Sequence, residues 1–261
     1  MLLAIDVGNT QTVLGLLEGE EVVDHWRVAT DARRTADEFM AVLRGLLADG
    51  ADDRVDGIAI CSTVPSVLRE MRDMVARYFR SVPSILVEPG VRTGVPVLVD
   101  NPREVGTDRV VNALAARYLY GGPCIVVDLG TATTFDVVSE NGEYLGGAIA
   151  PGIEVSLNAL GDVGAQLRRV ELVRPRSVIA KNTVEALQSG ALYGFVGQVD
   201  GIVTRMAAEL GRPLSKITVI ATGGLAPLVL DECATIDHHE PWLTLVGLRL
   251  VYDRNIDESW L

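Results

Sequence analysis

AIDVGNT at residues 4–10 and VVDLGTA at residues 126–132 are two versions of one pattern. In each version an apolar run leads to an aspartate, a tight turn with glycine follows, and hydroxyl or amide side chains come next. The two aspartates, Asp6 and Asp128, are 122 residues apart in a chain of 261, which is close to half its length. The repeat predicts two related halves that face each other across a nucleotide.

Each half is predicted to open with three strands and to continue through a helix, a strand and a helix. We expect an N-terminal half over residues 1–120 and a C-terminal half over residues 121–261, with the break at Gly121-Gly122-Pro123. This order resembles the actin-like ATPase fold shared with Hsp70 and sugar kinases. The expected fold class is α/β, with two duplicated actin-like (ribonuclease H-like) halves, each a mixed five-stranded sheet flanked by helices.

Some shorter segments carry local signals of their own. Thr35 and Glu38 have the spacing of a capping box, which predicts a helix from Ala36 onward. The stretch TGGL at residues 222–225 follows a predicted strand and is expected to open a possible helix. Its paired glycines could let the backbone approach an adenosine or a phosphate, although a plain turn is the competing interpretation.

The composition excludes several classes of protein. A net charge of −12 argues against a nucleic-acid or anionic-membrane surface, which requires a basic footprint. No apolar stretch reaches the roughly 18 residues of a membrane span, and the start of the chain lacks the features of a signal peptide. Three scattered cysteines and three histidines show neither disulfide nor metal spacing. We therefore expect a soluble cytoplasmic protein with no nucleic-acid or membrane partner.

The first copy of the pattern suits a triphosphate. Gly8 allows the backbone to come close to a ligand, and the backbone N–H groups with the Thr10 hydroxyl can donate to phosphate oxygens. Asp6 cannot bind phosphate directly, but its carboxylate can hold Mg²⁺ through water. In the second copy, Thr131 is the expected phosphate donor and Asp128 the candidate cation ligand.

A third motif, GTDR at residues 106–109, lies where a long loop is expected to become a helix. An acid next to a fixed cation suits a small substrate that has both a hydroxyl and a carboxylate. Asp108 could accept the hydroxyl proton, and Arg109 could bind the carboxylate with two hydrogen bonds. The alternative is a purely structural role, since aspartate is common in the first turn of a helix.

Taken together, these motifs resemble the type III pantothenate kinases of bacteria. The resemblance covers nearly the whole chain and follows the family's motif order. The motifs that carry it are DVGNT at 6–10, GTDR at 106–109, DLGTATT at 128–134, KNT at 181–183 and TGG at 222–224. Each motif alone is weak, and the set is highly specific. One departure is Val99, where many relatives have a tyrosine before the Asp-Asn-Pro of the substrate loop.

The resemblance implies that ATP phosphorylates the terminal hydroxyl of pantothenate to give 4'-phosphopantothenate, the first step of coenzyme A biosynthesis. It also implies a homodimer that depends on Mg²⁺ and on a monovalent cation, K⁺ or NH₄⁺. Asp108 would be the catalytic base, Asp128 would bind the monovalent cation and Asp6 would lie towards Mg²⁺. By motif position, the ATP-binding residues would be Asp6, Val7, Gly8, Asn9, Thr10, Gln11, Thr12, Val13 and Thr131. Those for pantothenate would be Gly106, Thr107, Asp108, Arg109 and Thr183.

Two other readings remain open from the sequence. One is a different kinase or a phosphatase of the actin-like superfamily, such as a sugar kinase or an exopolyphosphatase. The other is a catalytically silent nucleotide-binding protein that acts as a transcriptional accessory factor. The retained reactive residue in every motif argues against the second reading.

Overall fold

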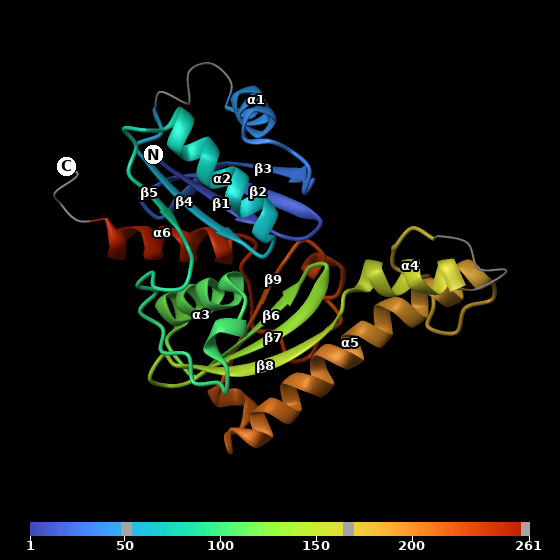
Figure 1. The fold of residues 1–261 in the computed structure, drawn as a ribbon. Helices are drawn as coiled ribbons and strands as arrows, with labels where there is room; N and C mark the ends of the chain where they lie inside the picture. Colours follow the sequence, from blue (N-terminus) through green and yellow to red (C-terminus); the bar gives the residue numbers. More distant parts are fainter. Residues whose placement is uncertain (48–53, 164–169, 257–261) are drawn as a thin grey trace. The chain divides into compact units, whose positions relative to one another are not determined.

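The computed structural model describes residues 1–47, 54–163 and 170–256 and divides into two compact units (Figure 1). The first unit consists of Met1–Val95, Asp100–Ala115 and Trp242–Leu261, and the second of Pro96–Val99 and Ala116–Pro241. These units follow contacts in space, so the C-terminal end of the chain belongs with its beginning. The division at residue 120, which concerns the duplicated halves of the sequence, stays a prediction.

The first unit is built on a five-stranded sheet with the order β3-β2-β1-β4-β5. The strand β1 pairs antiparallel with β2 and parallel with β4, so it lies at the centre of the sheet. The end of β1 therefore lies between β2 and β4, and residues of both neighbouring strands can contact a ligand there. The strands are β1 (Leu2–Val7), β2 (Gln11–Glu18), β3 (Glu21–Ala29), β4 (Gly57–Ser62) and β5 (Ser84–Leu86).

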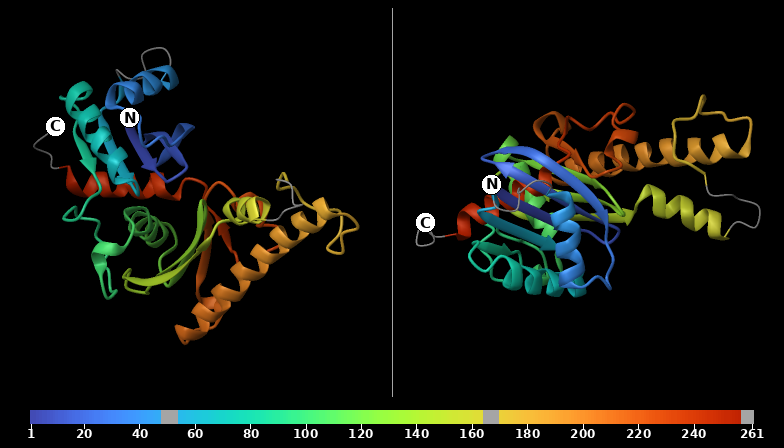
Figure 2. Two further views of the ribbon diagram at one scale, coloured as in Figure 1. Left: turned by 45° about the vertical axis from the view of Figure 1, so that its right-hand side comes forward. Right: turned by 90° about the horizontal axis from the view of Figure 1, so that it is seen from above.

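Helices pack on both faces of this sheet (Figures 1 and 2). Leu3 and Ile5 of β1 share one apolar core with Phe39, Met71 and Met74 of the helices α1 and α2. Alternate residues of a strand point to opposite faces, and α6 packs against β1 and β4 on the other face. The helices of this unit are α1 (Ala36–Leu46), α2 (Pro65–Tyr78), the start of α3 (Thr107–Tyr120) and α6 (Leu243–Asn255).

The capping box expected at the start of α1 is confirmed. The Glu38 N–H donates to the Thr35 hydroxyl, and the Thr35 N–H donates to Oε2 of Glu38 over 2.9 Å. Among the described residues, none of the helices combines the length and the apolar character that a membrane span requires.

The second unit repeats the topology of the first. Its sheet has the order β10-β9-β6-β7-β8, with β6 antiparallel to β7 and parallel to β9. The strands are β6 (Cys124–Leu129), β7 (Ala132–Val138), β8 (Tyr144–Pro151), β9 (Thr218–Thr222) and β10 (His238–His239). Two duplicated mixed five-stranded sheets flanked by helices confirm the expected fold class.

The second unit also contains the end of α3 and the helices α4 (Ile153–Val163) and α5 (Thr183–Glu209). Val199 and Val203 of α5 pack on Val127 and Phe135 in the apolar core of this sheet. The expectation of a helix at residues 222–225 is only partly met, because the chain there forms a short 3₁₀ turn over Ala226–Leu228. A helix that started at Gly223 would need the N–H of residue 227 to donate to the carbonyl oxygen of Gly223, and Pro227 has no N–H.

Candidate active site

The first unit places the carboxyl group of Asp6 near the carboxyl end of its central strand. Asp6 lies directly beside Cys61 of the parallel strand β4. The Cys61 thiol is buried and donates a hydrogen bond of 3.2 Å to Oδ1 of Asp6. Cys61 lies in an apolar run, where a cysteine is typically a small core residue. The structure shows that it is also the hydrogen-bond partner of the first aspartate.

The start of α3 is joined to the end of the same strand. The Thr107 hydroxyl donates to the carbonyl oxygen of Ser62 over 3.4 Å, and Ser62 directly follows Cys61. In the first turn of α3, the N–H of Arg109 donates to Oδ1 of Asp108 over 2.9 Å. The motif of residues 106–109 therefore lies at the same edge of the sheet as Asp6.

Both carboxyl groups have raised pKa values, and the charge of Asp108 acts on Asp6. Burial, together with the negative charge of Asp108, raises the pKa of Asp6 to about 7, while the hydrogen bond from Cys61 acts in the opposite direction. Burial also raises the pKa of Asp108, and the neighbouring N–H and charge of Arg109 oppose this. Burial and both carboxylates raise the pKa of the Cys61 thiol, which keeps it protonated as a donor. Carboxyl groups with raised pKa values in a polar cluster are typical of functional sites.

This arrangement can accept a magnesium ion that is held mainly by water and phosphate oxygens. No group of three or more His, Cys, Asp or Glu side chains within the described residues is arranged to hold a metal by protein ligands alone. Mg²⁺ bound with nucleotides commonly uses one or two carboxylates and keeps several waters. Burial and, after it, the charge of Asp108 disfavour the ionised form of Asp6, and a cation beside Asp6 would offset both effects, so the carboxylate fits the ion.

The turn after Asp6 is closed by its own backbone. The Gly8 N–H donates to the carbonyl oxygen of Gln11 over 3.0 Å, and Asn9 and Thr10 between them are exposed. The first phosphate motif is therefore a short exposed turn that follows directly from a buried strand. Exposed backbone and hydroxyl groups at such a turn are suited to phosphate oxygens.

The second unit forms a corresponding turn after Asp128. The Gly130 N–H donates to the carbonyl oxygen of Ala132 over 3.0 Å, and Thr131 lies between them. Gly223 packs so closely against this strand that a Cβ atom there would lie 2.5 Å from Oδ1 of Asp128 and 2.6 Å from the carbonyl oxygen of Leu129. A carboxylate beside backbone carbonyl oxygens is a donor set that suits a monovalent cation.

The remaining residues expected at the site lie elsewhere in the second unit. Thr183 is the first residue of α5 and is exposed, and the helix is capped by Asn182, whose Oδ1 accepts the N–H of Glu185 over 2.9 Å. Val99 lies beside β8, where its Cγ1 is 3.6 Å from the position that a Cβ atom on Gly146 would take. Thr183 thus belongs to the second unit, whereas Asp6 belongs to the first.

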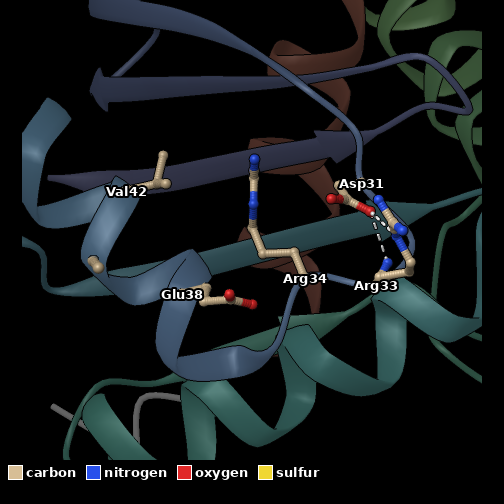
Figure 3. A pocket seen from close by; sticks show the side chains of 6 residues that line it. Asp31, Arg33, Arg34, Glu38 and Val42 are labelled. Atoms are coloured by element: carbon tan, nitrogen blue, oxygen red, sulfur yellow. Dashed lines mark hydrogen bonds and ion pairs between the residues drawn. The ribbon is translucent and has the colours of Figure 1, made fainter.

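An open groove of about 670 Å³ lies between α1 and the segment that leads into it (Figure 3). Arg33 extends beside Asp31, while Arg34 points towards the strands and donates to the carbonyl oxygen of Ala29 over 3.4 Å. Glu38, Ala41 and Val42 of α1 form the opposite side. Asp6 and Asp108 do not line this groove. The assignment of the carboxyl cluster as a functional site therefore depends on its own hydrogen bonds and charges.

Sequence reasoning missed one further residue of this edge, Thr30. It directly follows β3 and makes three hydrogen bonds to residues of the first turn and of β2. An isolated threonine after a strand carries no distinctive signal. Only the pairing of β3 with β2 brings it next to the turn.

Comparisons with known proteins agree on one family. A profile described as Type III pantothenate kinase matches residues 2–205. The Type III pantothenate kinase of Streptomyces avermitilis is 66% identical over 265 residues, covering 99% of this chain and 100% of that protein. The Type III pantothenate kinase of Thermobifida fusca is 63% identical over 257 residues, covering 98% of this chain and 100% of that protein.

A solved structure resembles the fold at much lower identity. A Campylobacter jejuni protein described under the Baf family of transcriptional activators superposes with a TM-score of 0.60 and 17% identity, covering 97% of this chain and 98% of that chain. At this identity the likeness concerns the fold alone.

Proposed function

The chain belongs to the type III pantothenate kinase family, and from this premise we propose how its own residues carry out the family's reaction. The enzyme phosphorylates pantothenate with ATP, the first step of coenzyme A biosynthesis. Its relatives at about two-thirds identity favour this activity over a catalytically silent accessory role. The observation that carries the proposal is the meeting of Asp6, Cys61 and Asp108 at one edge of the first sheet.

Asp108 acts as the general base. It accepts the proton of the terminal hydroxyl of pantothenate while that oxygen attacks the γ-phosphorus of ATP, the bond from this phosphorus to the β–γ bridging oxygen breaks, and ADP leaves. Its raised pKa brings it nearer to neutral pH, where a carboxylate is both ionised and basic enough to take a proton. The hydrogen bond from the N–H of Arg109 fixes the orientation of one carboxylate oxygen.

The segment Gly106 to Arg109 holds pantothenate. Arg109 binds the substrate carboxylate with its planar guanidinium, and Thr107 fixes the start of α3 against Ser62. Thr183 contributes a further contact to pantothenate. In this proposal, Thr183 makes that contact across a dimer interface.

Residues Asp6 to Val13 bind the phosphates of ATP together with Thr131 of the second turn. Asp6 would hold Mg²⁺ through water, and the ion would supply charge neutralisation to the phosphates of ATP. Phosphoryl transfer depends on positioning and on neutralised charge more than on covalent catalysis. An acidic protein with a net charge of −12 needs such cations to hold a triphosphate.

Asp128 holds a monovalent cation, K⁺ or NH₄⁺, at the second turn. This assignment is supported by two oxygen atoms that both lie close to Gly223, Oδ1 of Asp128 and the carbonyl oxygen of Leu129. Such an ion would offset the negative charge of Asp128 near the nucleotide.

The protein works as a homodimer in the cytoplasm. The dimer is supported by large apolar side chains that are exposed near the end of β8 and before the start of α5. In this region α4 and α5 lie side by side (Figure 2). Ile149, Val178 and Ile179 are 66%, 61% and 83% exposed, and a larger exposed apolar patch is typical of an interaction surface. We expect the cytoplasm as its location because the enzyme needs ATP and pantothenate as substrates there.

The product tests the proposal directly. Purified protein is incubated with ATP, Mg²⁺ and K⁺ and with a panel of acceptors that includes pantothenate, glucose and N-acetylmannosamine. Mass spectrometry should find a phosphorylated product from pantothenate alone. Phosphorylation of a sugar without phosphorylation of pantothenate would contradict the proposal.

A further inference from the structure

The first phosphate turn is held in shape by a residue outside its motif, Thr30. The Thr30 hydroxyl donates to the carbonyl oxygen of Gly8 over 2.8 Å, and the Thr30 N–H donates to the carbonyl oxygen of Thr10 over 3.0 Å. The same hydroxyl lies 2.9 Å from the hydroxyl of Thr12. Thr30 thus makes three hydrogen bonds, two with residues of the turn and one with Thr12 of β2, the strand that follows the turn.

The direction of these hydrogen bonds can be worked out. A threonine hydroxyl has one proton to donate, and that of Thr30 goes to the Gly8 carbonyl. The Thr12 hydroxyl must therefore donate to Thr30, which forms a chain from Thr12 through Thr30 to Gly8. Thr12 is only 1% exposed, so the hydrogen bond between the two hydroxyl groups is shielded from water on the Thr12 side.

These bonds determine where the N–H groups of the turn point. The peptide group is planar and trans, so a carbonyl oxygen and the following N–H point in opposite directions. With the Gly8 carbonyl fixed on Thr30, the N–H of Asn9 is directed away from Thr30, and Asn9 is exposed. An N–H group held in this way needs no reorganisation when a phosphate binds.

The second unit provides an internal comparison. There Gly152 occupies the position of Thr30, and its N–H donates to the carbonyl oxygen of Thr131 over 3.0 Å. No side chain fits at this position, because a Cβ atom on Gly152 would collide with the carbonyl oxygens of Gly130 and Thr131. Thr133, the counterpart of Thr12, is fully buried, and its hydroxyl has no hydrogen-bond partner among the described residues. The backbone bond is common to both turns, whereas the hydroxyl chain belongs to the first alone.

We propose that Thr30 is a positioning residue for nucleotide binding, whose hydroxyl holds the first phosphate turn in the conformation that receives the ATP phosphates. The inference rests on the proposed function of that turn. It assigns to Thr30 no contact with the substrate itself. The loss of its hydroxyl should weaken nucleotide binding while pantothenate binding stays the same.

The test compares three variants. Thr30→Val removes the hydroxyl at nearly constant volume, and Thr30→Ser retains it. Thr235→Val is the matched control, because the Thr235 hydroxyl makes a bond of equal length, 2.8 Å, to Oδ1 of Asp200 in the second unit. Calorimetry measures binding of a non-hydrolysable ATP analogue with Mg²⁺, and thermal unfolding measures stability. Thr30→Ala replaces the valine variant if that one does not fold.

Removal of one or two hydrogen bonds predicts a Kd for the analogue that rises roughly 5- to 30-fold in Thr30→Val. Thr30→Ser should stay within about threefold of wild type, and KM for pantothenate should change by less than about twofold in both. Thr235→Val should lower the Tm without a change in nucleotide affinity. Unchanged analogue binding by Thr30→Val, or an equal loss in Thr235→Val, would overturn the inference.

A separate measurement distinguishes this result from failure of the proposed function. Pantothenate-dependent ADP release is measured for the wild-type protein. Absence of that turnover would contradict the proposed function and would leave the binding comparison of the Thr30 variants intact. An active wild type with an unaffected Thr30→Val variant would contradict the role of Thr30 alone.

Discussion

The thiol of Cys61 donates a hydrogen bond of 3.2 Å to Oδ1 of Asp6 across the neighbouring strands β4 and β1. This contact lowers the pKa of a carboxyl group which burial and the charge of Asp108 raise to about 7. In the second sheet, Thr222 occupies the same position beside Asp128. Each motif aspartate is thus flanked on the parallel strand by a side chain that can donate a hydrogen bond.

Removal of the thiol should make Asp6 harder to ionise. In Cys61→Ala we expect the acid limb of the pH profile of kcat/KM for ATP to move to higher pH, because the ionised carboxylate is the form that attracts Mg²⁺. Activity at pH 6.5 should fall several-fold while activity at pH 8.5 changes little. Cys61→Ser retains a donor and should resemble wild type. Identical acid limbs in all three proteins would show that the thiol does not act on Asp6.

Replacement of the proposed base should separate binding from chemistry. Asp108→Asn should bind the ATP analogue with wild-type affinity or better, because a negative charge near Asp6 is removed. Its turnover should fall by roughly 10²- to 10⁴-fold, the usual contribution of a general base. Steady-state ADP release and calorimetry measure the two quantities. A turnover near that of wild type would remove Asp108 from this role.

The stability of the nucleotide-free and metal-free protein should fall as the pH rises towards 7. Asp6 has an ordinary pKa of 3.8 in the unfolded chain and about 7 in the folded one, so between these values the folded state holds an extra proton. Its contribution is fully present below the unfolded pKa and is lost as the pH rises through the folded pKa. We expect a decrease on the order of 2 kcal/mol in the free energy of unfolding between pH 5 and pH 8.

Urea denaturation at the two pH values measures this difference. It should be clearly smaller in Asp6→Asn, which has no carboxyl group to titrate at that position. Asp73→Asn alters an exposed carboxyl of α2 and should retain the wild-type dependence. Equal pH dependence in Asp6→Asn and wild type would contradict the raised pKa of Asp6.

The capping box of α1 should contribute to stability and not to catalysis. Thr35→Ala removes the side chain that accepts the Glu38 N–H, and the usual cost of such a change is about 1 kcal/mol. Urea denaturation should show this loss, with KM for ATP and pantothenate unchanged. Thr35→Ser should retain most of the stability. A large change in either KM would mean that α1 affects the site more directly.

The monovalent cation should act through Asp128. Wild-type turnover should be several-fold higher in K⁺ than in Na⁺ at equal ionic strength, and Asp128→Asn should lose most of that difference. Initial rates in the two salts, with saturating ATP and pantothenate, measure the effect. A K⁺ dependence that survives in Asp128→Asn would place the cation elsewhere.

Local signals in the sequence predicted most of the fold. The apolar runs before Asp6 and Asp128 and the capping box at Thr35 each depend on neighbours within a few residues, and each matches the structure. Such features can be read without knowledge of distant contacts. The duplicated pattern also predicted two related halves, and the two sheets do have the same topology.

What the sequence could not predict depends on contacts between distant segments. The strand β10 at His238–His239 has only two residues and is defined by its pairing with β9. The helix α6 starts only at Leu243, yet it belongs with the first sheet, because it packs against β1 and β4. The hydrogen bonds of Thr30 and Cys61 likewise exist only once the strands are aligned. Their roles could not be inferred from residue type alone.

The central claim is that this chain transfers phosphate from ATP to pantothenate with Asp108 as the base. The most direct measurement is ADP release by the purified protein with ATP, Mg²⁺ and K⁺, in the presence and absence of pantothenate. We predict release that requires pantothenate and that falls at least 100-fold in Asp108→Asn. Release that is independent of pantothenate, or no release at all from the wild-type protein, would contradict the account.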